Sequence, residues 1–123
     1  MPKSILIIED DRDLVQVLSH RLKREGYEVF TADDGKEGLT TAKEKLPSLV
    51  LLDVMLPEKD GFEVLADLKH DKKTKAIPVI LITAKSQETD ITFALGHGAD
   101  DYLIKPFSIP ELLLRVKKQM EPK

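Results

Sequence analysis

The sequence predicts an α/β fold, a doubly wound sheet of five parallel strands with helices on both faces. Short apolar segments alternate five times with segments whose apolar residues recur at helical spacing. This order is typical of βα units joined by right-handed crossovers. Three strand-like segments, Ile5–Ile8, Leu49–Asp53 and Val79–Thr83, are apolar at successive positions, which is typical of strands buried on both faces. These three strands should lie at the centre of the sheet.

The first two βα units have clear boundary signals. The helix after the first strand carries leucines every four residues: Leu14, Leu18 and Leu22. Asp11 or Asp13 can cap its start, and Gly26 ends it. The next strand, Tyr27–Ala32, is less apolar and should lie near an edge of the sheet. A turn at Asp33–Gly35 then starts a second, weaker helix.

The middle of the chain continues the alternation. Phe62, Leu65 and Leu68 predict a helix after the Leu49–Asp53 strand. The charged segment 70–76 is expected to be a solvated loop. A further helix, capped by Ser86 or Thr89, should end near residues 96–98.

The chain ends with a short strand and a helix. The strand covers Asp101–Lys105, and Pro106 breaks it. Ser108 is expected to cap the helix, with Pro110 in its first turn. Its inner face carries five apolar residues: Ile109, Leu112, Leu113, Val116 and Met120. Leu114 falls off this face and should be exposed.

Composition narrows the possible functions. The chain has 123 residues, a net charge of -3 and no cysteine. Its length suits one domain, which we expect to span residues 1–123. The charge gives no reason to expect direct binding of nucleic acid or of an anionic membrane. Disulfides and thiolate metal sites are excluded, and no segment suits a signal peptide or a membrane span, so the cytoplasm is the expected location.

Polar residues stand where the predicted strands end. Glu9 and Asp10 follow the first strand, Asp53 ends the third, Thr83 ends the fourth and Lys105 ends the fifth. Parallel strands bring these ends to one edge of the sheet, which is where open α/β folds bind ligands. Asp53 by itself could simply start a turn. Five such residues at one edge predict a functional site.

The predicted site suits a divalent cation and phosphoryl transfer. Neighbouring carboxylates repel one another, and Mg²⁺ prefers an all-oxygen site of one or two carboxylates with waters and phosphate oxygens. Lys105 adds a fixed positive charge. In this arrangement Asp53 would be the nucleophile that accepts a phosphoryl group. The cation and Lys105 would then neutralise the phosphoryl oxygens, and the Thr83 hydroxyl could donate to one of them.

At this point a family can be recognised over essentially the whole chain. The segments that carry the resemblance are Ile5–Asp11 (ILIIEDD), Leu51–Pro57 (LLDVMLP) with Asp60–Gly61, Thr83–Ala84 and Gly98–Phe107 (GADDYLIKPF). They resemble the receiver (CheY-like) domain of two-component response regulators. The resemblance implies the flavodoxin-like strand order 2-1-3-4-5.

The resemblance also implies a role for each site residue. Asp53 matches the phosphoacceptor, and Glu9 and Asp10 match the acidic pair. Asp10 and Asp53 would bind Mg²⁺ directly, together with the backbone carbonyl of Met55. The remaining matches are Thr83 as phosphoryl-bonding and switch residue, Tyr102 as the aromatic residue that turns inward, and Lys105 as the partner of the phosphoryl group. The family has a cis bond at Lys105–Pro106.

Partners follow from the same resemblance. A sensor histidine kinase or phosphotransfer protein would supply the phosphoryl group. A downstream effector, or a second copy of the chain, would bind the face formed by the fourth helix, fifth strand and fifth helix. Four charged residues match the dimerisation pattern of winged-helix regulators: Asp100, Asp101, Glu111 and Arg115. Ile91 and Phe93 depart from it, which instead predicts a hydrophobic contact that includes Phe93 and Leu114.

Three other functions are compatible with parts of the pattern. An FMN-binding protein would share the fold but needs a phosphate loop where this chain has Glu9, Asp10 and Asp11. An aspartyl-nucleophile phosphatase would typically carry a second acid at position 55, which is a methionine here. A receiver-like interaction module without phosphoryl chemistry usually lacks one of the site residues, and none is missing here.

Overall fold

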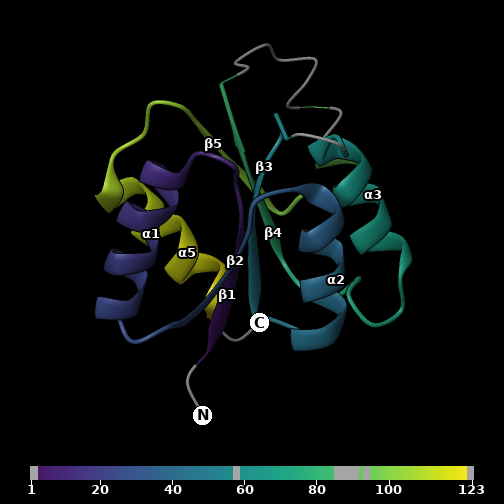
Figure 1. The fold of residues 1–123 in the computed structure, drawn as a ribbon, viewed down its shortest axis with the longest axis horizontal. Helices are drawn as coiled ribbons and strands as arrows, with labels where there is room; N and C mark the ends of the chain where they lie inside the picture. The colour runs from purple at the N-terminus through teal and green to yellow at the C-terminus, as the bar shows by residue number, and fades with distance from the viewer. Residues whose placement is uncertain (1–2, 57–58, 85–91, 93–94, 122–123) are drawn as a thin grey trace.

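The structure is a computed structural model that describes residues 3–56, 59–84, 92 and 95–121. Figure 1 shows a central sheet between two layers of helices, with α1 and α5 over one face and α2 and α3 over the other. The elements, in chain order, are β1 (Ser4–Ile8), α1 (Arg12–Arg24), β2 (Glu28–Ala32), α2 (Gly35–Lys45), β3 (Leu49–Asp53), α3 (Gly61–His70), β4 (Val79–Thr83), β5 (Asp101–Ile104) and α5 (Ile109–Met120). The predicted caps of the fourth helix, Ser86 and Thr89, lie outside the described residues.

The sheet is parallel throughout and has the order β2-β1-β3-β4-β5, as the resemblance implied. The three strands expected at the centre, β1, β3 and β4, are the three inner ones. Each strand sends alternate side chains to opposite faces. In β1, Leu6 and Ile8 pack into the core under α2 and α3, while Ile5 and Ile7 pack into the core under α1 and α5. Burial on both faces explains why these strands are apolar at every position.

The predicted caps of the described helices are present. The Asp11 side chain accepts hydrogen bonds from the amides of Asp13 and Leu14 at the start of α1. Ser108 caps α5 through the amide of Glu111. All five residues of the predicted inner face of α5 are buried or packed against the core.

One segment differs from its prediction. The solvated loop expected at 70–76 contains Thr74, which has no exposed surface. Its hydroxyl donates a 2.7 Å hydrogen bond to the carbonyl of Leu68 and so satisfies a carbonyl at the end of α3. Because most residues around Thr74 are charged, the sequence pattern predicted that Thr74 would be exposed as well. None of the helices in the described part of the chain combines the length and apolar character needed to span a bilayer.

Gly61 begins α3 at a point with no room for a side chain. A β-carbon there would overlap the carbonyl oxygen of Asp53 and come within 2.6 Å of the α-carbon of Val54. Both obstacles are backbone atoms, which cannot rotate aside. The short contact therefore holds α3 directly against the end of β3.

We expect Gly61→Ala to lower the free energy of unfolding by about 1–3 kcal/mol, the usual size of an overpacking effect. Gly96→Ala is the control, because a β-carbon there meets no atom within 4 Å. Urea unfolding followed by circular dichroism measures both variants. A Gly61→Ala protein as stable as the wild type would contradict the tight packing of α3 on β3.

Candidate functional site

Three strands deliver the charged groups of the site. Glu9 follows β1 and Asp53 ends β3, and these strands are neighbours in register, with Ile8 beside Leu52. Lys105 follows β5, on the far side of β4. Its long side chain reaches across to both acids. The Nζ lies 2.9 Å from Oε1 of Glu9 and 3.3 Å from Oδ2 of Asp53.

The two acids are buried but fully partnered. Glu9 is 1% exposed and Asp53 is 3% exposed. The second oxygen of Glu9 accepts a 3.1 Å hydrogen bond from the amide of Asp11, and Oδ1 of Asp53 accepts a 3.0 Å bond from the amide of Met55. Each carboxylate thus has one oxygen on a backbone amide and the other on Lys105. Such pairing offsets the high cost of removing a charge from water.

The pKa shifts follow this arrangement. Burial raises the pKa of Glu9, and the neighbouring Asp53 carboxylate raises it further against the opposing effect of Lys105. Partial loss of water contact raises the pKa of Asp10, and Glu9 beside it adds to the shift. Burial by itself would lower the pKa of Lys105, but Glu9 and Asp53 outweigh it and the pKa is raised. The Lys105 ammonium therefore stays charged.

The acids fit a hard divalent cation. Glu9, Asp10 and Asp53 each present a carboxylate oxygen, and these oxygens lie within 4.8 Å of one another. Asp10 stands at the exposed mouth, while the other two lie behind it. An all-oxygen set with one side open to water is the kind of site that Mg²⁺ favours, because Mg²⁺ keeps several of its waters.

The other predicted site residues lie at the same edge or next to it. Thr83 ends β4, between the strands that carry Asp53 and Lys105, and its side chain is almost fully buried. Its backbone carbonyl accepts a 2.8 Å hydrogen bond from the amide of Lys105. Tyr102 lies in β5 beside Leu81 and is partly buried. Met55, two residues after Asp53, is 61% exposed. The Lys105–Pro106 bond is cis, as the resemblance implied.

Two features of the site were not predicted. The sequence analysis placed the positive charge of Lys105 beside the acids and assigned it to a phosphoryl group, but it did not specify the two direct ion pairs with Glu9 and Asp53. It also did not foresee the amides of Asp11 and Met55 as donors. Each amide lies two residues after the acid that it contacts, which is the spacing of an Asx-type turn after a strand. That spacing is the signal that could have revealed them.

Comparisons with known proteins agree with this geometry. Residues 5–117 match the family of response regulator receiver domains. The chain is 45% identical over 117 residues to the alkaline phosphatase synthesis transcriptional regulatory protein PhoP of Bacillus subtilis, covering 95% of this chain and 48% of that protein. The chain thus spans about half the length of this curated relative.

Solved structures show the same fold. A CheY-like response regulator receiver domain protein from Methanospirillum hungatei superposes with a TM-score of 0.91 at 32% identity, over 98% of this chain and 94% of that one. The receiver domain of the sensor histidine kinase PA1611 from Pseudomonas aeruginosa has a TM-score of 0.88 at 28% identity, over 98% of both chains. In that structure a magnesium ion is coordinated in the active site cleft.

The chain belongs to the receiver domain family of two-component response regulators. It is a signalling switch of the kind that phosphorylation controls.

We expect Asp10→Asn to raise the melting temperature of the metal-free protein by a few degrees while weakening Mg²⁺ binding. The substitution removes one of three clustered negative charges. A like-charge contact at about this range is worth about 1 kcal/mol in a water-like medium, which corresponds to a few degrees for a domain of this size. Differential scanning calorimetry and Mg²⁺ titration calorimetry measure the two effects.

Asp33→Asn is the matched control, since the exposed Asp33 belongs to a second acidic group, with Asp34 and Glu37. It should leave Mg²⁺ affinity at the acidic site unchanged. A clear fall in the melting temperature of Asp10→Asn would argue against repulsion within the site.

Proposed function

We propose that residues 1–123 form one receiver domain that accepts a phosphoryl group on Asp53 in a Mg²⁺-dependent reaction. The donor would be the phosphohistidine of a sensor histidine kinase or of a phosphotransfer protein. The observation that carries the proposal is the Lys105 ammonium placed between the buried Glu9 and Asp53 carboxylates. Two buried acids paired with a lysine at one edge of the sheet would add little to a purely structural core.

Asp53 acts as the nucleophile. One of its oxygens attacks the phosphorus and a new O–P bond forms. The P–N bond to the donor imidazole breaks, and its electron pair stays on the imidazole nitrogen. The Met55 amide orients Asp53 by holding Oδ1, which leaves the group ready to react without reorganisation.

Positive charge at the site stabilises the transferred group. When bound by Glu9, Asp10, Asp53 and the Met55 carbonyl, Mg²⁺ would supply charge neutralisation for the phosphoryl oxygens. Lys105 already contacts Asp53, and its ammonium would pair with the phosphoryl group once that group is attached to Asp53. Thr83, on the intervening strand, would donate its hydroxyl to a phosphoryl oxygen.

The same contacts would transmit the signal. Thr83 and Tyr102 lie on adjacent strands, so a shift of the Thr83 hydroxyl toward the phosphoryl group would make room for the Tyr102 ring to turn inward. Phosphorylation then favours one of two existing conformations through contacts that only that conformation makes. Position 55 carries no acid, so hydrolysis of the aspartyl phosphate would be slow autodephosphorylation rather than enzymatic turnover.

Asp53→Asn should abolish phosphoryl labelling by acetyl phosphate and by a histidine kinase, because an amide is a poor nucleophile and a weaker metal ligand. Intact-mass spectrometry measures the gain of one phosphoryl group, with and without Mg²⁺. Asp60→Asn is the control, since Asp60 caps α3 in the same loop region. Undiminished labelling of Asp53→Asn, or equal labelling of the wild type without Mg²⁺, would contradict the proposal.

The face beside β5 and α5 is the proposed docking surface. A groove of ≈ 550 Å³ is lined by Asp101, Glu111, Leu114, Arg115, Lys117, Lys118 and Glu121. Leu114 is 71% exposed, as its place off the inner face of α5 predicted. Asp101 and Arg115 pair with each other at 2.6 Å within the chain. Phe93 and Ile91 lie outside the described residues. We propose a hydrophobic contact through Leu114, with an effector or with a second copy.

Leu114→Ala should weaken phosphorylation-induced dimerisation several-fold while leaving Asp53 labelling intact. The physical reason is the loss of exposed apolar surface at the centre of the contact. Leu46→Ala, which truncates another exposed leucine at the end of α2, is the matched control. Sedimentation velocity with acetyl phosphate and Mg²⁺ measures the effect. Identical dimerisation of Leu114→Ala and wild type, or a labelled wild type that stays monomeric, would contradict self-association through Leu114.

A further inference from the structure

The Asp101 side chain links β5, the strand that carries Tyr102, to α5. Its Oδ1 atom accepts two hydrogen bonds, one from the Tyr102 amide at 2.8 Å and one from Nη1 of Arg115 at 2.6 Å. The Asp101 side chain is 14% exposed and the Arg115 side chain 34%, so the carboxylate is largely shielded from water while the guanidinium is partly open to it. A short charge-assisted bond in such a place holds the Arg115 guanidinium in one position.

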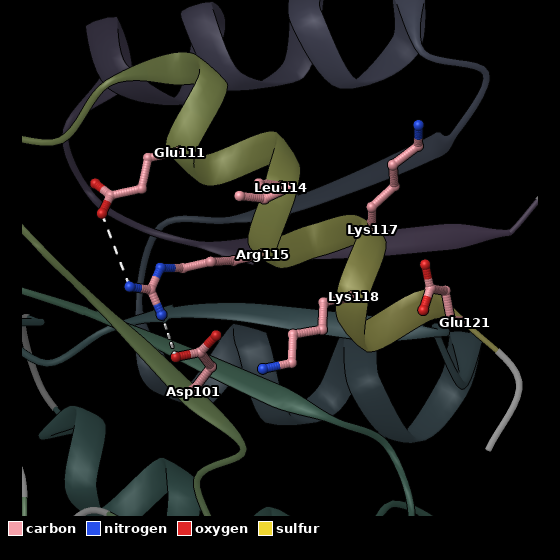
Figure 2. A pocket seen from close by; sticks show the side chains of 7 residues that line it. All are labelled: Asp101, Glu111, Leu114, Arg115, Lys117, Lys118 and Glu121. Carbon is pink, nitrogen blue, oxygen red and sulfur yellow. Dashed lines mark hydrogen bonds and ion pairs between the residues drawn. The ribbon is translucent and has the colours of Figure 1, made fainter.

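The position of Arg115 puts its charge over the Tyr102 ring. The guanidinium carbon lies 5.9 Å from the ring centroid, within the range of a cation–π contact. The second nitrogen, Nη2, lies 3.8 Å from Glu111 on the preceding turn of α5. Figure 2 shows the guanidinium reaching from α5 toward Asp101 on β5, with Glu111 on its other side. Two acids thus orient one cation against the ring.

We infer that Arg115 is a positioning residue that holds the Tyr102 ring in its unphosphorylated orientation and so sets the resting balance of the switch. The inference rests on the proposed role of Tyr102 as the residue that turns inward. A ring that turns away from α5 leaves the guanidinium and loses the cation–π contact. Because only one conformation has this contact, Arg115 favours that conformation.

A merely structural role for Arg115 makes a different prediction. If it only tied α5 to β5, its loss would lower the stability of the fold without changing how Tyr102 is distributed between its two orientations. Stability measurements do not separate the two roles. The orientation of Tyr102 itself must be observed.

The chain contains two tyrosines, Tyr27 and Tyr102, so a single substitution leaves Tyr102 as the one labelled tyrosine. Protein labelled with 3-fluorotyrosine on a Tyr27→Phe background reports Tyr102 as a single fluorine NMR signal. Spectra of the wild type with and without acetyl phosphate and Mg²⁺ define the two end positions. Intact-mass spectrometry of the same samples confirms the gain of one phosphoryl group, and Asp53→Asn, which should not gain it, assigns it to Asp53.

Without a phosphoryl donor, Arg115→Gln should move the Tyr102 signal toward the phosphorylated position. A partly exposed cation–π contact corresponds to a change of roughly two- to fivefold in the ratio of the two orientations. Arg115→Lys should shift it less, because lysine keeps the charge but lacks the planar fork. Lys118→Gln is the control, since Lys118 lines the same groove, whereas the cation over the Tyr102 ring is Arg115.

A Tyr102 signal in folded Arg115→Gln that stays at the wild-type position would overturn the inference. Should this variant fail to fold, Arg115→Met, which keeps an apolar stem and loses the charge, is judged by the same criterion. A wild type that is labelled at Asp53 but whose Tyr102 signal does not move would disprove the switch role of Tyr102, and the inference with it. A wild type that cannot be labelled would instead disprove the proposed function. The resting spectra would then still test whether Arg115 positions the ring, because an unmoved Tyr102 signal in Arg115→Gln overturns the inference in either case.

Discussion

The Lys105 ammonium lies between two carboxylates that the sheet has almost entirely removed from water, and the rest of the site depends on this contact. β1 and β3 are buried on both faces, so a charged side chain can follow them only at the edge of the sheet. Glu9 and Asp53 meet there because their strands are neighbours in register. Without a cation they would repel each other in a poorly solvated place. Lys105 supplies that cation from the end of β5, which is separated from β3 by β4.

The same arrangement explains why the site suits phosphoryl transfer better than it suits stability. Three acids and one ammonium leave an excess of negative charge, which disfavours the folded metal-free protein and favours a divalent cation. Backbone amides of Asp11 and Met55 hold the buried acids without neutralising them. The Asp53 carboxylate is therefore fixed in place by the Met55 amide and by Lys105, and such positioning would suit the proposed phosphoacceptor. A core of matched apolar residues would be more stable and chemically inert.

β5 connects this site to the surface where a partner would bind. Lys105 follows the strand at the site, Tyr102 lies within it, and Asp101 begins it beside α5. Arg115 contacts both Asp101 and the Tyr102 ring. One short strand thus carries groups that face the acids and groups that face α5. A shift of the strand or of its tyrosine at one end would change contacts at the other, with no need for a large movement of the domain.

Much of this protein follows from its sequence, because the signals involved are local. Apolar runs marked the central strands, Asp11 and Ser108 marked helix starts, and the spacing along α5 predicted that Leu114 would be exposed. The acids and the lysine could be assigned to one edge because parallel strands end together.

Other features depended on side chains that meet only after folding. The bridge made by Lys105 spans 96 residues of sequence to Glu9, and the contact of Arg115 with Tyr102 joins a helix to a strand. Thr74 points inward from a charged loop, where its hydroxyl donates a hydrogen bond to a carbonyl at the end of α3. The strand order could be inferred only from the resemblance to receiver domains, because the local pattern of a strand does not show which strands lie beside it. The sequence by itself therefore determined which apolar residues are buried and which edge of the sheet carries the charged groups. The tertiary structure alone decided which charges pair, because pairing depends on distances that no local pattern encodes.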